Sequence, residues 1–426
     1  MRRLREGYKD TKIGLIPNDW SICKLGEKSF IKARIGWRGL KADEYTDEGP
    51  LLIAGKHIKG SNIIWDEADH ISKERYDESP EIKLKLKDIV MSKDGTIGRV
   101  GYIDFLPGEA TINGTMMLIR PNDEFISKYI YFYFQDSNFK KIINEKVSGS
   151  SIPHIFQRDL VELLMPIPPL KEQEKIAEIL STVDSQIDDT EKLIEKSKEL
   201  KKGLMQKLLT KGIGHSEFKK TEVGEIPVEW RVKKLEEVCN VKGGKRLPKG
   251  YQLLDEKTNN PYIRVADMYE GGISLDDIKY VPSEIADKIK NYRISKEDLF
   301  ISVAGTLGIV GMIPSELDGA NLTENADKLC DIKINKEFLM RVLQSSTIQN
   351  IIESEKTSNA QPKLALTRIR EFIIPIPSKE EQEKISFILS SVDNQIEEYK
   401  NKKQKLEEVK KGLMQQLLTG KIRVTI

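Results

Sequence analysis

Two stretches of the chain place apolar side chains at alternating spacings of four and three residues, with charged residues at most positions between them. The apolar positions are Ile176, Leu180, Val183 and Ile187 in the first stretch, and Ile385, Leu389, Val392 and Ile396 in the second. Each stretch follows a proline-containing segment, a typical start signal for a helix. This spacing predicts two long helices, over residues 170–212 and 379–426, whose apolar seams pack together as a coiled coil.

Lysines and glycines interrupt both seams at matching places. Lys201 and Lys410 occupy seam positions, and Gly203 and Gly412 lie two residues further on. A close contact between the helices or local fraying would each explain the glycines, which cost about 1 kcal/mol relative to alanine inside a helix. Because a helix of ~40 residues is about 60 Å long, the first helix carries the chain away from the preceding region. The second helix must therefore return antiparallel if the two pack together.

Outside the two helices, short apolar runs are separated by glycine, proline and asparagine, a pattern that predicts strands and loops. Such runs lie at residues 51–53, 89–91, 100–103 and 116–119. The aromatic-rich segment 129–139 has a counterpart at 338–348, and both are typical of helices packed into a core. We therefore predict mixed helix-and-strand domains over residues 1–169 and 213–378.

The two halves of the chain repeat one module at an offset of about 210 residues. Residues 11–17 and 221–227 share the pattern Thr-x-x-Gly-x-Ile-Pro, and residues 172–187 and 381–396 are identical at 12 of 16 positions. The predicted fold class is accordingly α+β. It consists of two tandem-repeat globular α/β domains, separated by two long antiparallel coiled-coil helices and related by a pseudo-twofold axis.

Composition narrows the class of protein. No run of roughly 18 apolar residues suggests a membrane helix, and the first residues lack the apolar centre of a secretory signal. The three cysteines, Cys23, Cys239 and Cys330, lie far apart and predict neither disulfides nor a zinc site. We therefore expect a cytoplasmic protein that does not bind membranes. With 69 Lys and Arg against 67 Asp and Glu, the net charge is only +2, which argues against the basic footprint of a nucleic-acid-binding protein.

No motif predicts a catalytic residue, a metal ligand or a cofactor loop in this chain. The segment from Gly49 to Lys56 resembles a phosphate loop but has the wrong glycine spacing, and His57 stands where Ser or Thr is needed. The four histidines lack the spacing of metal ligands. Residues 259–262 read Asn-Asn-Pro-Tyr, which lacks the first proline of the Asn-Pro-Pro-Tyr motif of amino-methyltransferases.

The positions of the basic residues along the chain are a better indication of DNA binding than their total number. One acid-free, glycine-containing loop lies between Glu27 and Asp43, and its counterpart lies between Glu237 and Asp255. The candidate DNA-binding residues are Lys32, Arg34, Trp37, Arg38 and Lys41 in the first loop, and Lys242, Lys245, Arg246, Lys249 and Tyr251 in the second. Such loops can neutralise phosphates and enter a groove, although an ordinary solvated loop would have the same composition.

A second matched loop precedes each long helix. Its candidate DNA-binding residues are Ser150, Ser151, His154 and Arg158 in the first copy, and Asn359, Gln361, Lys363 and Arg368 in the second. Small polar groups beside basic ones suit contacts with phosphates and base edges. Plain turn chemistry is the competing interpretation. The two loops keep their place but differ in side chains, as expected of two domains that read different sequences.

The whole chain resembles the specificity subunits of type I DNA restriction–modification systems. The resemblance rests on an Ile-Pro-x-x-Trp-x-x-x-x-Leu opening in each half, which starts at Ile16 and at Ile226. It also rests on the Asp-Gly-Thr-Ile-Gly turn that begins at Asp94, on the shared helix start, and on the Lys-Gly-Leu-Met-Gln-x-Leu-Leu-Thr-Gly segment at 411–420. Ala304 departs from the pattern because it stands where the first copy has Asp94.

This resemblance implies two target-recognition domains, each of which reads one half of an asymmetric bipartite site in double-stranded DNA. The helices would set the spacing of the half-sites and dock two methyltransferase (modification) subunits. Restriction (translocase/nuclease) subunits would complete the complex. S-adenosylmethionine, ATP and Mg would then bind the partner subunits, and this chain would perform no catalytic step.

Two other classes of protein stay open at this point. One is a coiled-coil adaptor that binds only proteins and has no DNA specificity, and the other is an autonomous enzyme. Charge is balanced within each predicted region rather than between regions, so the near-neutral total conceals the acid-free loops. We expect the lone chain to bind DNA weakly without its partners, which would supply much of the phosphate contact.

Overall fold

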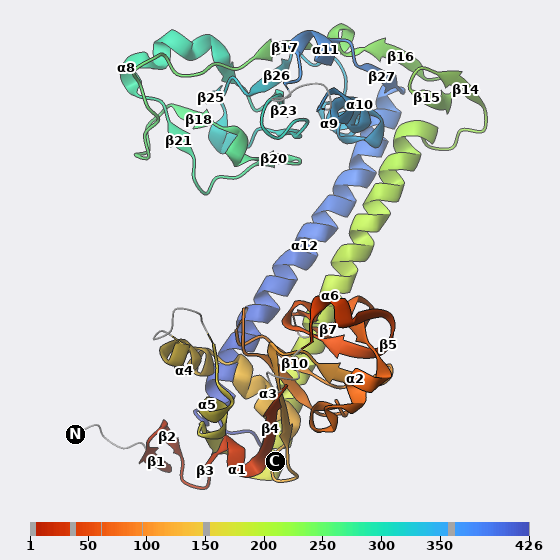
Figure 1. Cartoon of the computed structure of the whole chain (residues 1–426). Helices are drawn as coiled ribbons and strands as arrows, with labels where there is room; N and C mark the ends of the chain where they lie inside the picture. Colours follow the sequence, from red (N-terminus) through yellow and green to blue (C-terminus); the bar gives the residue numbers. More distant parts are fainter. Residues whose placement is uncertain are drawn as a thin grey trace. The chain divides into compact units, whose positions relative to one another are not determined.

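The computed structural model describes residues 6–34, 40–60, 62–95, 97–147, 154–356 and 363–425 (Figure 1). The chain divides into two compact units. Unit 1 comprises Met1–Lys192 together with Lys400–Ile426, and unit 2 comprises Leu193–Tyr399. Each unit therefore contains one globular domain, the first half of one long helix and the second half of the other. None of the helices in the described ranges is long and apolar enough to cross a membrane.

The globular part of unit 1 is built around two small sheets. The first is antiparallel, with the order β10 (Val100–Tyr102), β9 (Ile89–Ser92), β12 (Met116–Pro121) and β4 (Ser29–Ala33). The second has the order β11 (Ala110–Ile112), β5 (Tyr45–Ile53) and β8 (Asp69–Ile71), and β11 runs parallel to β5. Residues of β9 and β12 alternate between two apolar clusters, so this sheet has a core on both faces.

Hairpins and short helices complete unit 1. The paired strands are β1 (Tyr8–Thr11) with β2 (Gly14–Pro17), β3 (Ser21–Lys24) with β13 (Leu164–Ile167), and β6 (Ile58–Lys59) with β7 (Asn62–Ile63). The helices are α1 (Leu25–Lys28), α2 (Lys73–Asp77), α3 (Ser127–Gln135), α4 (Ser137–Val147) and α5 (Gln157–Val161). The aromatic segment predicted as one helix forms α3 and the start of α4, and its rings pack into the larger core. Asp136 separates the two helices with extended backbone angles.

Unit 2 repeats this plan. One antiparallel sheet has the order β17 (Asn240–Gly243), β26 (Ala326–Cys330), β23 (Leu299–Ser302) and β24 (Val310–Met312). The other has the order β21 (Lys279–Tyr280), β18 (Pro261–Ile263), β25 (Ala320–Leu322) and β22 (Arg293–Ile294). The hairpins and pairs are β14 (Phe218–Thr221) with β15 (Gly224–Pro227), β16 (Arg231–Lys234) with β27 (Ile373–Ile376), and β19 (Met268–Tyr269) with β20 (Gly272–Ile273). The short helices are α7 (Leu235–Val238), α8 (Ser283–Ala286), α9 (Lys336–Gln344), α10 (Ser346–Lys356) and α11 (Leu366–Arg370).

The two predicted long helices are α6 (Leu170–Lys211) and α12 (Lys379–Leu417). In unit 1 the two helices run antiparallel, because Lys403 pairs with Glu191 while Lys410 pairs with Asp184. All eight predicted seam residues are buried. Ile176 and Leu180 join the core of the unit 1 domain, and Ile385 and Leu389 join that of unit 2. The seams therefore attach each helix to its globular domain as well as to the other helix.

The lysines that interrupt the seams each form an ion pair within their own unit. In unit 1, Lys410 lies 2.5 Å from Asp184, and in unit 2, Lys201 lies 2.7 Å from Asp393. The four side chains are partly or largely buried. Gly203 and Gly412 have open space where a Cβ would stand, and both helices continue through them. Neither a close helix contact nor fraying explains these two glycines.

The second long helix is shorter than predicted, since α12 ends at Leu417 instead of continuing to residue 426. Gly420 adopts a φ of +67°, which only glycine adopts readily. A Cβ at this position would lie 2.6 Å from Pro17 of the same unit. Gly212 has the same role after α6, with a φ of +64° and a close approach to Trp230. Each long helix is thus followed, within one to three residues, by a glycine packed against the start of a globular domain.

A buried Trp–Glu pair holds each domain on the first turn of its helix. In unit 1, Trp20 Nε1 donates to Glu172 at 2.9 Å, and in unit 2, Trp230 Nε1 donates to Glu381 at 2.9 Å. Both tryptophans are almost completely buried. This pair explains why both halves of the chain repeat the Ile-Pro-x-x-Trp opening and the Glu-Gln-x-Lys helix start.

Candidate nucleic-acid interface

In each unit the second predicted loop, which precedes α5 in unit 1 and α11 in unit 2, pairs with a glycine-containing turn. This turn begins at Asp94 in unit 1 and at Ala304 in unit 2. In unit 1 the turn follows β9, and Asp94 forms an isolated antiparallel bridge with His154. The Ile155 N–H also donates to the Lys93 carbonyl at 3.1 Å. In unit 2 the bridge joins Ala304 and Lys363. The second of the two predicted loops is therefore anchored to the same turn in both copies.

The first predicted loop starts at the end of β4 in unit 1 and of β17 in unit 2, each separated from the strand before the glycine turn by one other strand. In unit 1, α5 contacts β4, the strand that leads into the basic loop. In unit 2, α11 contacts β17, and Arg370 donates to the Val241 carbonyl at 3.0 Å. Figure 1 shows α11 beside β17 and α5 beside β4. The structure thus brings both predicted loops of each copy to the same edge of the antiparallel sheet, namely the edge at which β4 and β9 end in unit 1 and β17 and β23 end in unit 2.

The unit 1 basic loop contains one residue that the prediction misplaced. Arg34 is only 5% exposed, and its Nε donates to the Ile112 carbonyl at 3.2 Å. Burial and the nearby charge of Arg75 lower the pKa of the Arg34 guanidinium. Arg34 was predicted to contact DNA, and this is wrong for the described conformation because the side chain points into the domain.

The other residues of this loop divide into two groups. Lys32 is half-buried on β4, and Lys41 is exposed where its backbone N–H donates to Glu44 at 2.7 Å. Trp37 and Arg38 lie outside the described residues. Lys32 and Lys41 therefore remain the surface cations of the loop that the structure describes.

The second loop of unit 1 presents a cluster of rings and charges. His154 Nδ1 is hydrogen-bonded to Asp94, whose other oxygen lies 2.8 Å from Lys93 Nζ. Burial raises the pKa of the Asp94 carboxyl, but the hydrogen bonds from Lys93 and His154 outweigh burial and hold this pKa below its ordinary value. The Arg158 guanidinium lies over the ring of Phe156, 4.7 Å from its centre. Ser150 and Ser151 lie outside the described residues.

Phe156 belongs to this cluster but was not predicted as a site residue. Its side chain is 48% exposed, and its ring lies 4.5 Å from that of His154. A phenylalanine between a predicted histidine and a predicted arginine was the available signal. The sequence alone does not identify Phe156 as a site residue, because a phenylalanine is more often part of a core.

The basic loop of unit 2 is exposed, but two of its cations already have partners. Lys242 lies 3.9 Å from Asp331, and Arg246 lies 2.5 Å from Glu324. The hydrogen bond from Arg246 lowers the pKa of Glu324 although burial opposes it. Pairs this exposed contribute little to stability, so a phosphate can replace the carboxylates at low cost.

The remaining residues of this loop are held by the backbone. The Lys245 N–H donates to the Leu322 carbonyl at 2.8 Å, while the Lys245 Nζ lies 5.6 Å from the centre of the Tyr292 ring. Lys249 and Tyr251 are exposed, and Lys288 approaches the Tyr251 ring. The loop therefore has a fixed backbone and exposed tips.

The second loop of unit 2 ends beside a buried acid. Lys363 is exposed, and Arg368 lies 2.9 Å from Glu355. Asn359 and Gln361 lie outside the described residues. Asp327 on β26 is 5% exposed, and its Oδ2 has no hydrogen-bond partner within the described residues. Burial raises the pKa of Asp327 to about 6, although the charges of Lys363 and Arg370 oppose this.

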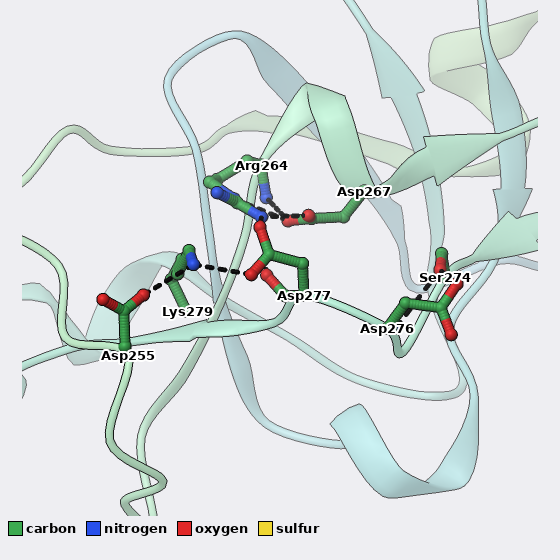
Figure 2. Close-up of polar contacts among 7 residues, drawn as sticks. All are labelled: Asp255, Arg264, Asp267, Ser274, Asp276, Asp277 and Lys279. Carbon is green, nitrogen blue, oxygen red and sulfur yellow. Dashed lines mark hydrogen bonds and ion pairs between the residues drawn. The ribbon is translucent and has the colours of Figure 1, made fainter. Parts of the chain in front are cut away.

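A separate ion-pair network in unit 2 lies at residues 255–279 (Figure 2). Arg264 donates to Asp267 at 2.5 Å and also to Asp277, while Lys279 lies 2.6 Å from both Asp255 and Asp277. The hydrogen bonds from Lys279 and Arg264 lower the pKa of Asp277. Arg264 and Lys279 are much less exposed than Lys242 and Arg246, and each binds two carboxylates. This network therefore fixes β18, β21 and the 3-10 turn at Val265–Asp267 rather than offering charge to a phosphate.

Within the ranges that the structure describes, no three His, Cys, Asp or Glu side chains gather so as to hold a metal ion. What both units share is a sheet edge with two loops, one glycine turn and exposed cations. Such an edge can hold a backbone phosphate and present side chains to base edges.

Comparison with known proteins agrees with the duplication of the chain. The model of the family described as the type I restriction modification DNA specificity domain matches residues 17–201 and again 227–408. A putative MjaX specificity subunit of a type I restriction enzyme from Methanocaldococcus jannaschii is 31% identical, with 98% of this chain and 97% of the relative covered. The MjaVIII specificity subunit of the same organism is 28% identical over 98% of this chain and 96% of its own length.

Solved structures share the fold. The S subunit of a type I restriction–modification system from M. genitalium superposes with a TM-score of 0.57 at 21% identity, covering 93% of this chain and 96% of that one. A chain from a structure of a type I R-M system also gives 0.57, at 15% identity over 96% of this chain and 99% of that one. The arrangement of helices and strands is therefore common to proteins with very different sequences.

Proposed function

The chain belongs to the type I restriction–modification DNA specificity family, and we propose that each of its two domains reads one half of a bipartite DNA target. It is a specificity subunit, so catalysis lies in partner subunits. The observation that carries the proposal is the duplicated sheet edge, where two loops with exposed cations occur in both units. The loops differ in their side chains, and the target is therefore an asymmetric sequence rather than a palindrome.

The partners follow from the same family. The chain works in a complex with DNA and other subunits. In our proposal, two methyltransferase subunits dock on α6 and α12, and restriction subunits join to complete the complex. S-adenosylmethionine, ATP and Mg then bind these partners and not this chain.

The long helices set the distance between the two half-sites in this proposal. The test inserts four residues between Lys192 and Leu193 in α6 and four between Tyr399 and Lys400 in α12. The insertion lengthens each helix by about 6 Å, which is nearly two base pairs at roughly 3.4 Å each. Genomic DNA of cells with the native gene, the inserted variant and no gene is then read by modified-base sequencing.

The expected result is a methylated adenine in an asymmetric bipartite site that disappears with the gene. In the inserted variant, the two half-sites persist and the gap between them grows. A matched control carries four extra residues between Lys12 and Ile13, in the hairpin of β1 and β2, and keeps the native gap. An unchanged gap in the helix variant would contradict the spacing role. A methylation pattern that is the same with and without the gene would instead favour a protein-binding adaptor.

A further inference from the structure

Phe156 differs from the other residues of the unit 1 interface because it is a large apolar side chain that is exposed to solvent. Ile155 is 1% exposed, so the backbone alternation directs His154 and Phe156 outward from the sheet edge. The Phe156 N–H donates to Asp159 at 3.1 Å, and its carbonyl accepts from the Asp159 N–H at 2.9 Å. The backbone thus fixes this ring at the start of α5.

The groups on either side of the ring are also held. His154 is hydrogen-bonded to Asp94, and its ring meets that of Phe156 nearly edge-on, with an angle of 62° between the planes. Arg158 lies over the Phe156 ring. The three side chains form one row at the surface, with the apolar ring between the His154 imidazole and the Arg158 guanidinium. Isolated surface phenylalanines are common, but this one lies between polar groups that suit a base edge.

In the major groove, the thymine C5-methyl is the apolar group that distinguishes one base pair from the others, and phenylalanine is among the side chains that contact it. Arginine nitrogens can donate to the neighbouring O4, O6 or N7 acceptors. Because the Nδ1–H of His154 donates to Asp94, its Nε2 is left to accept from an exocyclic base amine. We propose that Phe156 contacts a thymine methyl group in the half-site read by unit 1, and that it is a specificity-determining residue. The inference rests on the proposed function and adds the base chemistry to it.

The matching position in unit 2 provides an internal comparison. Ala365 occupies it, between Lys363 and Thr367, and Leu364 is buried in the way that Ile155 is. Ala365 also lies directly before its short helix α11, so the backbone arrangement is shared. Unit 2 therefore has Lys363 and Thr367 in place of His154 and Arg158, with no ring between them. The dependence on a large apolar contact therefore belongs to the unit 1 half-site.

The test compares duplexes that carry the target found by methylation sequencing. Each thymine of the two half-sites is replaced, one at a time, by deoxyuridine, which removes only the methyl group. The full chain with its co-purified methyltransferase subunits is then bound to each duplex in competition. One substitution in the unit 1 half-site should weaken binding roughly fivefold, the effect of one buried methyl group.

The Phe156→Ala variant should bind the native duplex as weakly as the native complex binds the deoxyuridine duplex, and it should no longer distinguish the two. The control is Phe105→Ala, since Phe105 is 59% exposed but follows β10, at the end of the β9–β10 hairpin away from the glycine turn. This variant should keep the full deoxyuridine effect.

Three outcomes would overturn the inference. These are a unit 1 half-site made only of G·C pairs, deoxyuridine effects that persist in Phe156→Ala, and a Phe156→Ala complex that loses its methyltransferase subunits but keeps the deoxyuridine effect. The last outcome would place a protein partner on the ring. In each case methylation of the native bipartite site still reports the proposed function, so the two failures remain distinguishable.

Discussion

The two units build the same framework but place different ionisable groups in it. In unit 1, the buried Glu172 binds Arg423 at 2.7 Å, and Arg423 also binds Asp19. In unit 2, the matching Glu381 binds His215 at 3.0 Å and accepts from the Ile213 N–H at 2.9 Å. The backbone plan is repeated in both units. The side chain that binds the glutamate, however, is an arginine from residue 423 in unit 1 and a histidine after α6 in unit 2.

Two further positions differ in the same way. At one register position of the central strand, unit 1 has Met117 opposite Ala33, and unit 2 has Asp327 opposite Gly243. At the 3-10 turn after β5 or β18, the Ala54 N–H donates to His57 Nδ1 in unit 1, while the Arg264 N–H donates to Asp267 in unit 2. The two units thus share the strand register and the hydrogen bond of the 3-10 turn, but they differ in which ionisable side chain stands at each position. The two units should therefore respond to pH with opposite signs.

The largest effect on stability is expected from the ionisation of Asp327 in unit 2. Its ordinary pKa of 3.8 rises to about 6 in the folded unit because of burial. Between these values the folded unit holds the proton more tightly than the unfolded chain does, so the stability of unit 2 falls as pH rises through this window. A shift of about two units corresponds to about 3 kcal/mol, and this loss is complete above about pH 6.

Replacing Asp327 by Met, the residue that unit 1 carries at this register, should remove the loss. At about pH 8, unit 2 should then be more stable by up to about 3 kcal/mol, and Asp327→Asn should show the same direction. Hydrogen–deuterium exchange of β26 and β23 peptides, corrected for the intrinsic rate at each pH, measures the change. Equal protection of the native protein at about pH 5 and about pH 8 would contradict the prediction.

An intermediate effect is expected at Arg423. The Arg423→Ala variant leaves the carboxylate of Glu172, which is 1% exposed, with the Trp20 indole as its remaining donor among the described residues. Removing one partner of a buried pair costs about 3–5 kcal/mol. We expect about 2 kcal/mol here because Arg423 is itself 40% exposed. Faster exchange in β3, β13 and the first turn of α6 would report this loss.

The matched change in unit 2 is His215→Ala. Glu381 keeps the Ile213 N–H and the Trp230 indole, so the cost should be about 1 kcal/mol, the value of one hydrogen bond. The comparison fails if His215→Ala destabilises unit 2 as much as Arg423→Ala destabilises unit 1. The two variants should also leave the other unit's exchange unchanged.

Local patterns and distant contacts differ in how well the sequence predicts them. The 4–3 spacing placed both long helices because periodicity is a local property, and the structure buries all eight predicted seam residues. The partners of Lys201 and Lys410 could not be predicted, since they depend on the register of an antiparallel pair. Spacing also could not show where the second helix ends, because that end is set by the contact of Gly420 with Pro17.

The candidate interface shows the same division. Acid-free loops are visible in the sequence, and exposed lysines follow from them. The burial of Arg34 could not be predicted because it depends on the Ile112 carbonyl, 78 residues away. The exposure of Phe156 could not be predicted either, since an aromatic side chain two residues after a polar one is compatible with a core or a surface. Which bases are read depends on this same loop geometry.

The smallest effect is expected at His57, where the sign is opposite to that of Asp327. His57 is 1% exposed, and burial lowers its pKa below the ordinary 6.5. Its Nδ1 must stay unprotonated to accept from the Ala54 N–H, so the unfolded chain binds a proton first as pH falls. The stability of unit 1 is therefore present above about pH 6.5 and is lost as pH falls below it.

His57→Asn supplies a neutral acceptor and should remove this acid sensitivity, which we expect to be about 1 kcal/mol, the value of one hydrogen bond. The measurement is exchange in β5 and β8 peptides at about pH 5 and about pH 7.5. Asp267 occupies the same turn in unit 2, where it accepts from the Arg264 N–H. The control is the same β5 and β8 peptides in the His57→Asn variant, which should keep their protection at both pH values. If the β5 peptide of the native protein keeps its protection at the lower pH, the neutral imidazole does not stabilise this turn, and the contrast between the units rests on Asp327 alone.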